Sequence, residues 1–126
     1  MRVLVADDQA PFRRAARAVI RATPGFELVA EATSGEQAVT LSGALHPDLV
    51  LMDILMAGMG GIAAARFIAA AHPATVTILL STYREEDLPP GARSCGAAGY
   101  VHKSEFGAGV LAQASERRAQ ASRSAR

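Results

Sequence analysis

Short apolar runs alternate with helical patterns along this chain. Apolar runs that predict β-strands cover residues 2–6, 26–32, 49–53, 76–80 and 99–103. Between them, apolar side chains recur at the three- and four-residue spacing of amphipathic helices, which predicts helices over residues 10–22, 34–45, 61–71 and 105–119. A further helix could start at Glu85, but Pro89-Pro90-Gly91 predicts that it is interrupted or short.

Polar residues mark several helix ends. Ser34 followed by Gln37 is a capping box at the start of the second predicted helix, and Ser104 is a candidate cap for the last one. His46 and His72 each precede a proline at the end of a helical pattern. The helix dipole and the proline stop explain both histidines, so we interpret them as structural.

The alternation of strands and helices predicts the fold class. Strands three and four are continuous apolar runs, which is typical of central parallel strands covered on both faces. Strand two carries Glu27 and Glu31, so it is predicted to lie at an edge. Five βα units favour an α/β, flavodoxin-like (βα)5 doubly wound sandwich with the strand order 2-1-3-4-5. In that order strand one lies beside strand three.

Composition narrows the class of protein. The chain has 126 residues and a net charge of +1, which fits one globular domain and argues against direct nucleic-acid binding by it. We expect the domain over residues 1–118, with 119–126 as a disordered tail or linker remnant. No run approaches the ~20 apolar residues of a membrane span, and no secretory leader precedes the first strand. Cys95 is the only cysteine, which fits a reducing cytoplasm.

Chemically competent side chains follow the predicted strands. Asp7 and Asp8 come after strand one, Asp53 ends strand three, Ser81 follows strand four, and Lys103, the only lysine, ends strand five. The exits of parallel strands share one rim, where such folds bind ligands. Three carboxylates there repel one another unless a hard cation such as Mg²⁺ lies between them. A carboxylate can also be the nucleophile toward a phosphoryl group.

The sequence resembles the receiver domain of two-component response regulators (the CheY-like family) across residues 1–118. The motifs that carry the resemblance are Val3-Leu4-Val5-Ala6-Asp7-Asp8, Pro47-Asp48-Leu49-Val50-Leu51-Met52-Asp53-Ile54, Gly58-Met59, Leu80-Ser81-Thr82-Tyr83 and Gly96-Ala97-Ala98-Gly99-Tyr100-Val101-His102-Lys103-Ser104. Each motif is weak alone, but their order and strand-end positions together are specific. The text around Ser81 and Lys103 is most similar to the NarL/LuxR-type subgroup.

The resemblance implies a phosphorylation switch rather than an enzyme, apart from slow self-dephosphorylation. Asp53 would accept a phosphoryl group from a sensor histidine kinase in the cytoplasm. Asp7, Asp8, Asp53 and the backbone carbonyl of Leu55 would hold Mg²⁺. The partner on the output side would be a downstream effector protein or a C-terminal output domain absent from this chain. No membrane partner is implied, and a homodimer is compatible with the sequence.

The resemblance also assigns roles around the phosphoryl group. Ser81 and Lys103 would bind its oxygens, and Ser81 with Tyr100 would form the switch. The output surface of the family usually comprises helix four, strand five and helix five. Four residues would flank the phosphoryl group: Ile54, Leu55, Thr82 and Tyr83. The bulk of Leu55 and Tyr83 would shield it from water and lengthen its lifetime.

Two alternatives stay open at this point. A degenerate receiver would act by contacts alone; Ala57, where proline is common, and Pro89-Pro90 allow it. A haloacid-dehalogenase-type aspartyl-phosphate phosphatase also uses acids, a hydroxyl and a lysine at strand ends. That class needs an Asp-x-Asp nucleophile motif and usually a cap, whereas Asp7 and Asp8 are adjacent.

Overall fold

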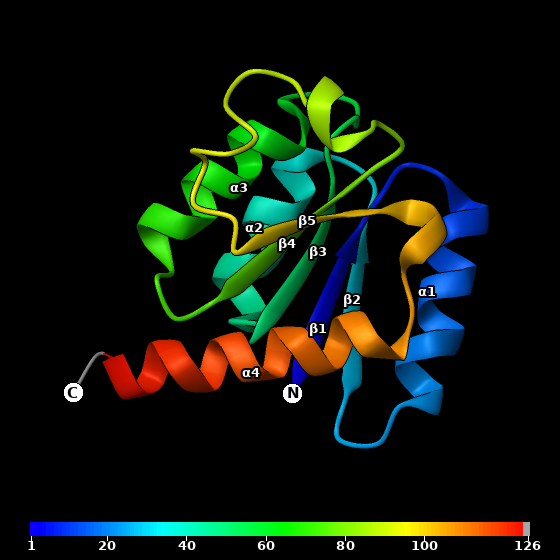
Figure 1. Cartoon of the computed structure of the whole chain (residues 1–126), viewed down its shortest axis with the longest axis vertical. Helices are drawn as coiled ribbons and strands as arrows, with labels where there is room; N and C mark the ends of the chain where they lie inside the picture. Colours follow the sequence, from blue (N-terminus) through cyan, green and yellow to red (C-terminus); the bar gives the residue numbers. More distant parts are fainter. Residues whose placement is uncertain (125–126) are drawn as a thin grey trace.

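The computed structural model describes residues 1–124, with side chains to residue 120, and forms an α/β sandwich around one parallel sheet (Figure 1). The strands, in the spatial order β2-β1-β3-β4-β5, are β1 (Arg2–Ala6), β2 (Glu27–Ala32), β3 (Leu49–Asp53), β4 (Val76–Ser81) and β5 (Gly99–His102). This is the predicted order, with β2 at one edge. Val3 to Ala6 pair with Leu49 to Met52, which places the ends of β1 and β3 side by side.

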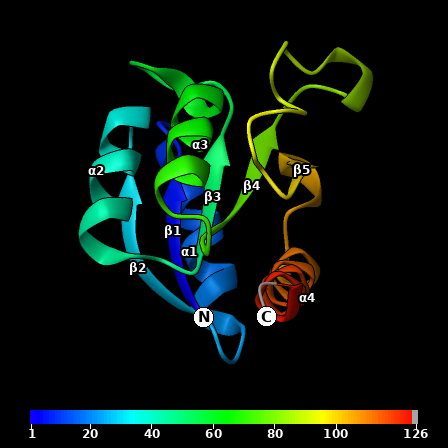
Figure 2. The ribbon, with the colours of Figure 1, turned by 90° about the vertical axis from the view of Figure 1, so that its left-hand side faces the viewer.

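Helices cover both faces of the sheet. They are α1 (Ala10–Ala22), α2 (Gly35–Leu45), α3 (Gly60–Ala71) and α4 (Ala108–Ser124). Figure 2 shows α2 and α3 together on one side of the strands. One core cluster joins the sheet to α2 and α3 through residues such as Ala38 and Ile68, and the other joins it to α1 and α4 through Ile20 and Leu111. β3 and β4 are buried throughout, as their continuous apolar runs predict.

The predicted helix ends are largely confirmed. Ser34 Oγ accepts the N–H of Gln37 at 3.1 Å and so caps α2. The Gln37 side chain accepts the N–H of Thr33 at 2.7 Å, one residue before the position that a capping box prescribes. His46 and His72 are the C-caps of α2 and α3, and their rings meet edge to face. Both histidines therefore have the structural role expected of them.

The segment between β4 and β5 departs from a (βα)5 pattern. Residues 82–98, all of them described, contain only the 3₁₀ turn η1 (Glu85–Asp87) and further turns, so residues 1–124 form four α-helices. Pro89 and Pro90 remove backbone donors, and Gly91 and Gly96 adopt φ values of 86° and 91°. These features end the helix that Glu85 could have started. The segment still covers the sheet, because Ala92 and Cys95 are buried in the core.

The C-terminal helix begins later than predicted. Lys103 is not the last residue of β5 but opens a second 3₁₀ turn, η2 (Lys103–Glu105), and Ser104 does not cap a helix. The Ser104 hydroxyl instead lies 2.7 Å from His102 Nδ1. α4 starts at Ala108, after Gly107, and continues through Ser124. The expected tail at 119–126 is thus helical as far as 124; residues 125–126 lie outside the described part, and a domain boundary at 118 stays a prediction.

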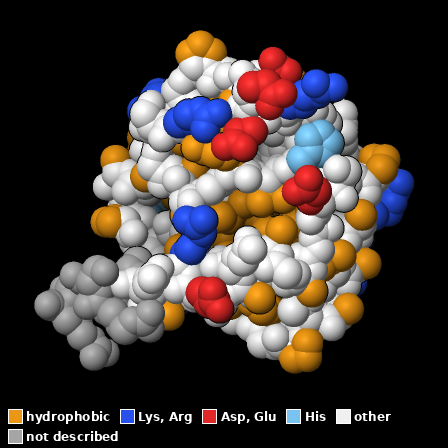
Figure 3. Space-filling model, in the orientation of Figure 1, with side chains coloured by type: hydrophobic (Ala, Val, Ile, Leu, Met, Phe, Trp, Pro, Cys, Tyr) orange, Lys and Arg blue, Asp and Glu red, His pale blue; other side chains and the backbone are white. Residues whose placement is uncertain are grey.

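A groove lies along the free edge of β5. Its cavity of about 600 Å³ is bounded by η1, by the start of the segment that replaces a helix, and by Arg117 of α4. In Figure 3 hydrophobic side chains form the floor of a hollow on this face, with charged side chains around it. The Arg117 guanidinium donates to the carbonyl of Ala98 at one end of β5. The groove therefore lies between β5, the non-helical segment that precedes it and α4.

Candidate functional site

Three carboxylates converge at the carboxyl ends of β1 and β3. Asp7 is fully buried, Asp53 is 5% exposed, and Asp8 is exposed on the loop after β1. Each of them offers an oxygen, and these oxygens all lie within 4.8 Å of one another. The parallel pairing of β1 with β3 brings them together, as predicted from the strand ends.

The Lys103 ammonium closes this cluster. Its Nζ lies 2.6 Å from Asp7 Oδ2 and 3.3 Å from Asp53 Oδ2. The ammonium also sits over the ring of Phe12, 4.9 Å from its centroid, a favourable cation–π distance. Burial alone would lower the pKa of Lys103, but the hydrogen bond to Asp7 and the charges of both aspartates raise it overall. Lys103 therefore stays charged between two buried acids.

Asp53 is held in an unfavourable place for a charge. Burial and then the charge of Asp7 raise its pKa from 3.8 to about 6, although Lys103 acts in the opposite direction. One of its oxygens accepts the N–H of Leu55 at 3.3 Å. A second cation beside Asp53 would relieve the repulsion, and carboxylate oxygens are the ligands that Mg²⁺ prefers. The donor set therefore fits a hard divalent cation.

A small cavity of about 60 Å³ opens beside Asp53, and Ser81 and Lys103 also line it. Ser81 lies at the end of β4 and is 3% exposed, and its Oγ accepts the N–H of Tyr83 at 2.8 Å. The cavity is lined by Gln9, Asp53, Ile54, Leu55, Ser81, Thr82, Tyr83 and Lys103. All four residues predicted to flank a phosphoryl group thus line it, together with Gln9, which the sequence did not single out.

Tyr100 lies apart from this cavity, against the core. Its side chain is half-buried on β5, and the Arg93 guanidinium lies 5.4 Å from the ring centroid. Arg93 in turn pairs with Glu85 at 3.6 Å. Arg93 of the segment that replaces a helix therefore lies over the aromatic ring, and the role of Tyr100 in switching stays a prediction.

Several supporting residues were missed in the sequence. Glu36 accepts the N–H of Met59 at 2.8 Å, which ties the loop after β3 to α2 and lowers the pKa of Glu36. Gly61 allows α3 to start against β3, because a Cβ there would collide with the carbonyl oxygen of Asp53. His102 links the ends of β4 and β5 through the Thr82 carbonyl at 3.2 Å. None of these contacts has a periodic signature.

Comparison with known proteins agrees with this geometry. A family model described as the response regulator receiver domain matches residues 3–115. The response regulator GacA of Pseudomonas viridiflava is 36% identical over 110 residues, which cover 87% of this chain and 50% of that protein. The chain belongs to the response regulator receiver family.

Solved structures of response regulators have the same fold as this receiver domain. A two-component response regulator of the LuxR family from Aurantimonas sp. SI85-9A1 is 31% identical with a TM-score of 0.84, covering 94% of this chain and 85% of that one. The response regulator domain of Thermotoga maritima CheB is 31% identical with a TM-score of 0.78, covering 96% and 95%. These matches confirm the predicted fold and the NarL/LuxR-type resemblance.

The receiver domain spans about half the length of the relatives that it matches in sequence, such as GacA at 50%. Within its described part, none of the helices is both long enough and apolar enough to cross a bilayer. The family is a signalling family of two-component systems.

Proposed function

We propose that this receiver domain accepts a phosphoryl group on Asp53 from a sensor histidine kinase in the cytoplasm. The observation that carries the proposal is the pairing of one lysine with two buried aspartates at adjoining strand ends. In the transfer, an oxygen of Asp53 forms the new bond to phosphorus while the bond from phosphorus to the donor breaks. The shared rim of β3, β4 and β5 brings Asp53, Ser81 and Lys103 to one cavity.

We further propose that Mg²⁺ is the resident cation. Asp7, Asp8, Asp53 and the carbonyl of Leu55 would hold it, and it would neutralise charge on the transferring group. Asp53 supplies the acceptor oxygen, and its burial keeps bulk water away from the bond that forms. Lys103 Nζ and Ser81 Oγ line the same cavity, so they can donate to phosphoryl oxygens.

The output side of the switch rests on Ser81 and Tyr100. The Ser81 hydroxyl would exchange its contact with the Tyr83 N–H for the phosphoryl group, and Tyr100 would then turn inward. Since no full helix separates β4 from β5, the output surface would consist of β5, the 82–98 segment and α4. An effector protein or output domain would bind there; a homodimer is compatible with this surface.

The two alternatives are less well supported. A receiver that acts only by contacts has no use for a charged lysine between Asp7 and Asp53. A phosphatase of the haloacid dehalogenase type is not indicated by the family match, which covers residues 3–115. The intact acidic cluster therefore favours the phosphoacceptor.

Incubation with acetyl phosphate and Mg²⁺ tests the proposal. We expect one phosphoryl group per chain, detected as a single mass increment that survives acid and is lost in base, as an acyl phosphate should be. Chelation of Mg²⁺ should stop the labelling. Failure to label with Mg²⁺ present, in a folded protein, would contradict the proposed function.

Leu55 is expected to control the lifetime of the phosphorylated state. Its side chain is 56% exposed at the mouth of the cavity beside Asp53, where it can block attacking water. Leu55→Asn or Tyr83→Glu should speed dephosphorylation, by about tenfold if the polar side chain orients a water molecule. Loss of the labelled mass over time after removal of acetyl phosphate measures this. Phe67→Asn changes an equally exposed apolar residue on α3 (55% exposed) and should leave the rate unchanged.

A further inference from the structure

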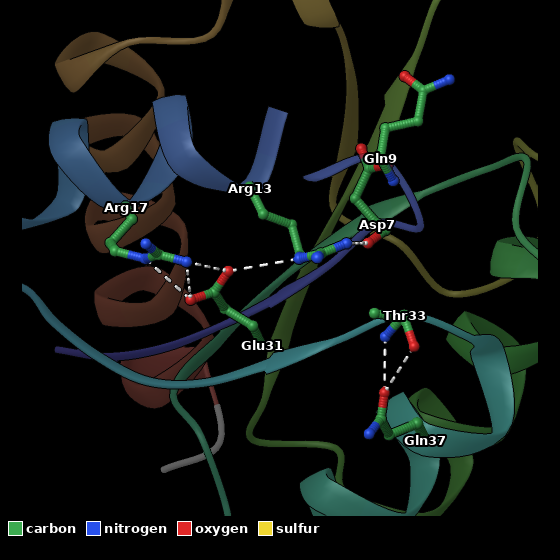
Figure 4. Close-up of polar contacts among 7 residues, drawn as sticks. All are labelled: Asp7, Gln9, Arg13, Arg17, Glu31, Thr33 and Gln37. Carbon is green, nitrogen blue, oxygen red and sulfur yellow. Dashed lines mark hydrogen bonds and ion pairs between the residues drawn. The ribbon is translucent and has the colours of Figure 1, made fainter. Parts of the chain in front are cut away.

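Next to the acidic cluster, an arginine of α1 hydrogen-bonds to the backbone of the loop after β1. Arg13 Nη1 donates to the carbonyl oxygen of Asp7 at 2.8 Å. Its Nε lies 3.4 Å from Glu31 of the edge strand β2. Glu31 is itself held by Arg17, with bonds of 2.9 and 3.0 Å to its two oxygens (Figure 4). We call Arg13, Arg17 and Glu31 the arginine clamp.

The clamp acts on the one peptide that joins the two acids. The Asp7 carbonyl belongs to the peptide between Asp7 and Asp8, so a hydrogen bond to it sets the orientation of that peptide. Asp7 is also fixed by its N–H, which donates to Ala32 at 2.9 Å, and by its side chain, which accepts the Gln9 N–H at 2.8 Å. Asp8 is exposed and joins no ion pair among the described residues. Its position therefore depends on the backbone of Asp7.

The clamp is built for orientation rather than for charge alone. The Arg13 and Glu31 side chains are only 19% and 22% exposed, and the fork of Arg13 reaches a carbonyl and a carboxylate at once. A lysine has a single ammonium and cannot reproduce that geometry. Glu31 offsets the positive charge that Arg13 would otherwise place near a cation site.

We propose that Arg13 is a positioning residue for the divalent cation: it fixes the Asp7–Asp8 peptide, and Glu31 and Arg17 hold it in place. This inference rests on the proposed function, because it assumes that Mg²⁺ binds at the acidic cluster. It predicts the direction in which Mg²⁺ affinity changes when Arg13 is replaced. A nearby cation repels a dication, so removal of Arg13 would tighten Mg²⁺ binding if its charge were what mattered. Loss of orientation weakens binding instead.

Calorimetric titration of Mg²⁺ into the metal-free chain tests the clamp. We expect Arg13→Gln to weaken binding about tenfold, the lower end of what the loss of an outer ligand-orienting group costs. Arg13→Lys, which keeps the charge, should also weaken it. Arg14→Gln is the matched control, since Arg14 is the exposed neighbour on α1 and carries the same charge. It should leave affinity unchanged or slightly tighter.

Glu31→Gln provides a second, independent arm. This variant keeps Arg13 but removes the carboxylate that holds its guanidinium, so we expect weaker Mg²⁺ binding. The double variant Glu31→Gln with Arg13→Gln should bind Mg²⁺ little more weakly than either single variant, because the two residues act together. Circular dichroism of the metal-free variants checks that each is folded. If Arg13→Gln does not fold, the Mg²⁺ affinity of Glu31→Gln tests the inference in its place. Unchanged or tighter binding in folded Arg13→Gln would overturn the inference.

Asp8→Ala separates this inference from the proposed function. If the unmodified chain binds Mg²⁺ and Asp8→Ala does not, the metal site stands, and the Arg13 variants then decide the clamp alone. If the unmodified chain does not bind Mg²⁺, or if Asp8→Ala binds it equally well, the metal site of the proposed function is wrong and the clamp falls with it.

Discussion

Asp53→Asn is expected to abolish labelling by acetyl phosphate and at the same time to stabilise the metal-free fold at neutral pH. The amide cannot form the acyl phosphate, so the mass increment should disappear. The stability gain follows because the ionised Asp53 is disfavoured by burial and by Asp7, which raise its pKa to about 6. We expect a gain of about 1 kcal/mol in the free energy of unfolding, because the neutral amide avoids the cost of a buried charge beside Asp7.

The pH dependence gives this prediction its sign. In the unfolded chain Asp53 loses its proton near 3.8, whereas in the fold it keeps the proton up to about 6. Between these values the folded state binds more protons, so the contribution of Asp53 to stability falls as pH rises from about 4 to 6 and is constant above. Thermal unfolding with a chelator at pH 5 and pH 7.5 should show this fall in the unmodified chain and a smaller one in Asp53→Asn. Labelling that persists in the variant would assign the phosphoryl group to another residue.

The rim of the site could be predicted because its signals are local. Asp7, Asp53 and Ser81 follow apolar runs, and parallel strands bring such positions to one edge. The contact between the Phe12 ring and the Lys103 ammonium could not be predicted in the same way. That contact depends on where η2 turns, and no pattern in the sequence encodes the turn.

Other parts needed tertiary information. Proline and glycine showed that the segment after Glu85 would be interrupted, but not that Ala92 and Cys95 would still complete the core. Ser104 has the residue type of a cap, yet its hydroxyl pairs with His102 instead. In the arginine clamp, the Arg13 side chain of α1 contacts both the Asp7 carbonyl after β1 and the Glu31 carboxylate of β2. Such pairings follow from packing, which single-sequence patterns do not report.

Lys103→Met is expected to destabilise the metal-free fold by about 3 kcal/mol at pH 8, because it leaves Asp7 and Asp53 buried without their cation. Without Lys103, which lowers the pKa of Asp53, that pKa rises above about 6. Asp53 then stays protonated to a higher pH, so the cost should be smaller at pH 5 than at pH 8. Urea unfolding of Lys103→Met and of the unmodified chain at pH 5 and pH 8 measures the loss of stability at each pH.

A matched control separates burial from the loss of an ion pair as such. Arg118→Met breaks a pair with Asp48 whose partners are 44% and 23% exposed, and exposed pairs contribute under about 1 kcal/mol. It should cost far less than Lys103→Met and show no comparable change with pH. A dication can replace the missing charge, so Mg²⁺ should raise the melting temperature of Lys103→Met more than that of the unmodified chain. Equal costs for the two variants would mean that Lys103 contributes packing rather than charge, and the electrostatic account of the site would then be wrong.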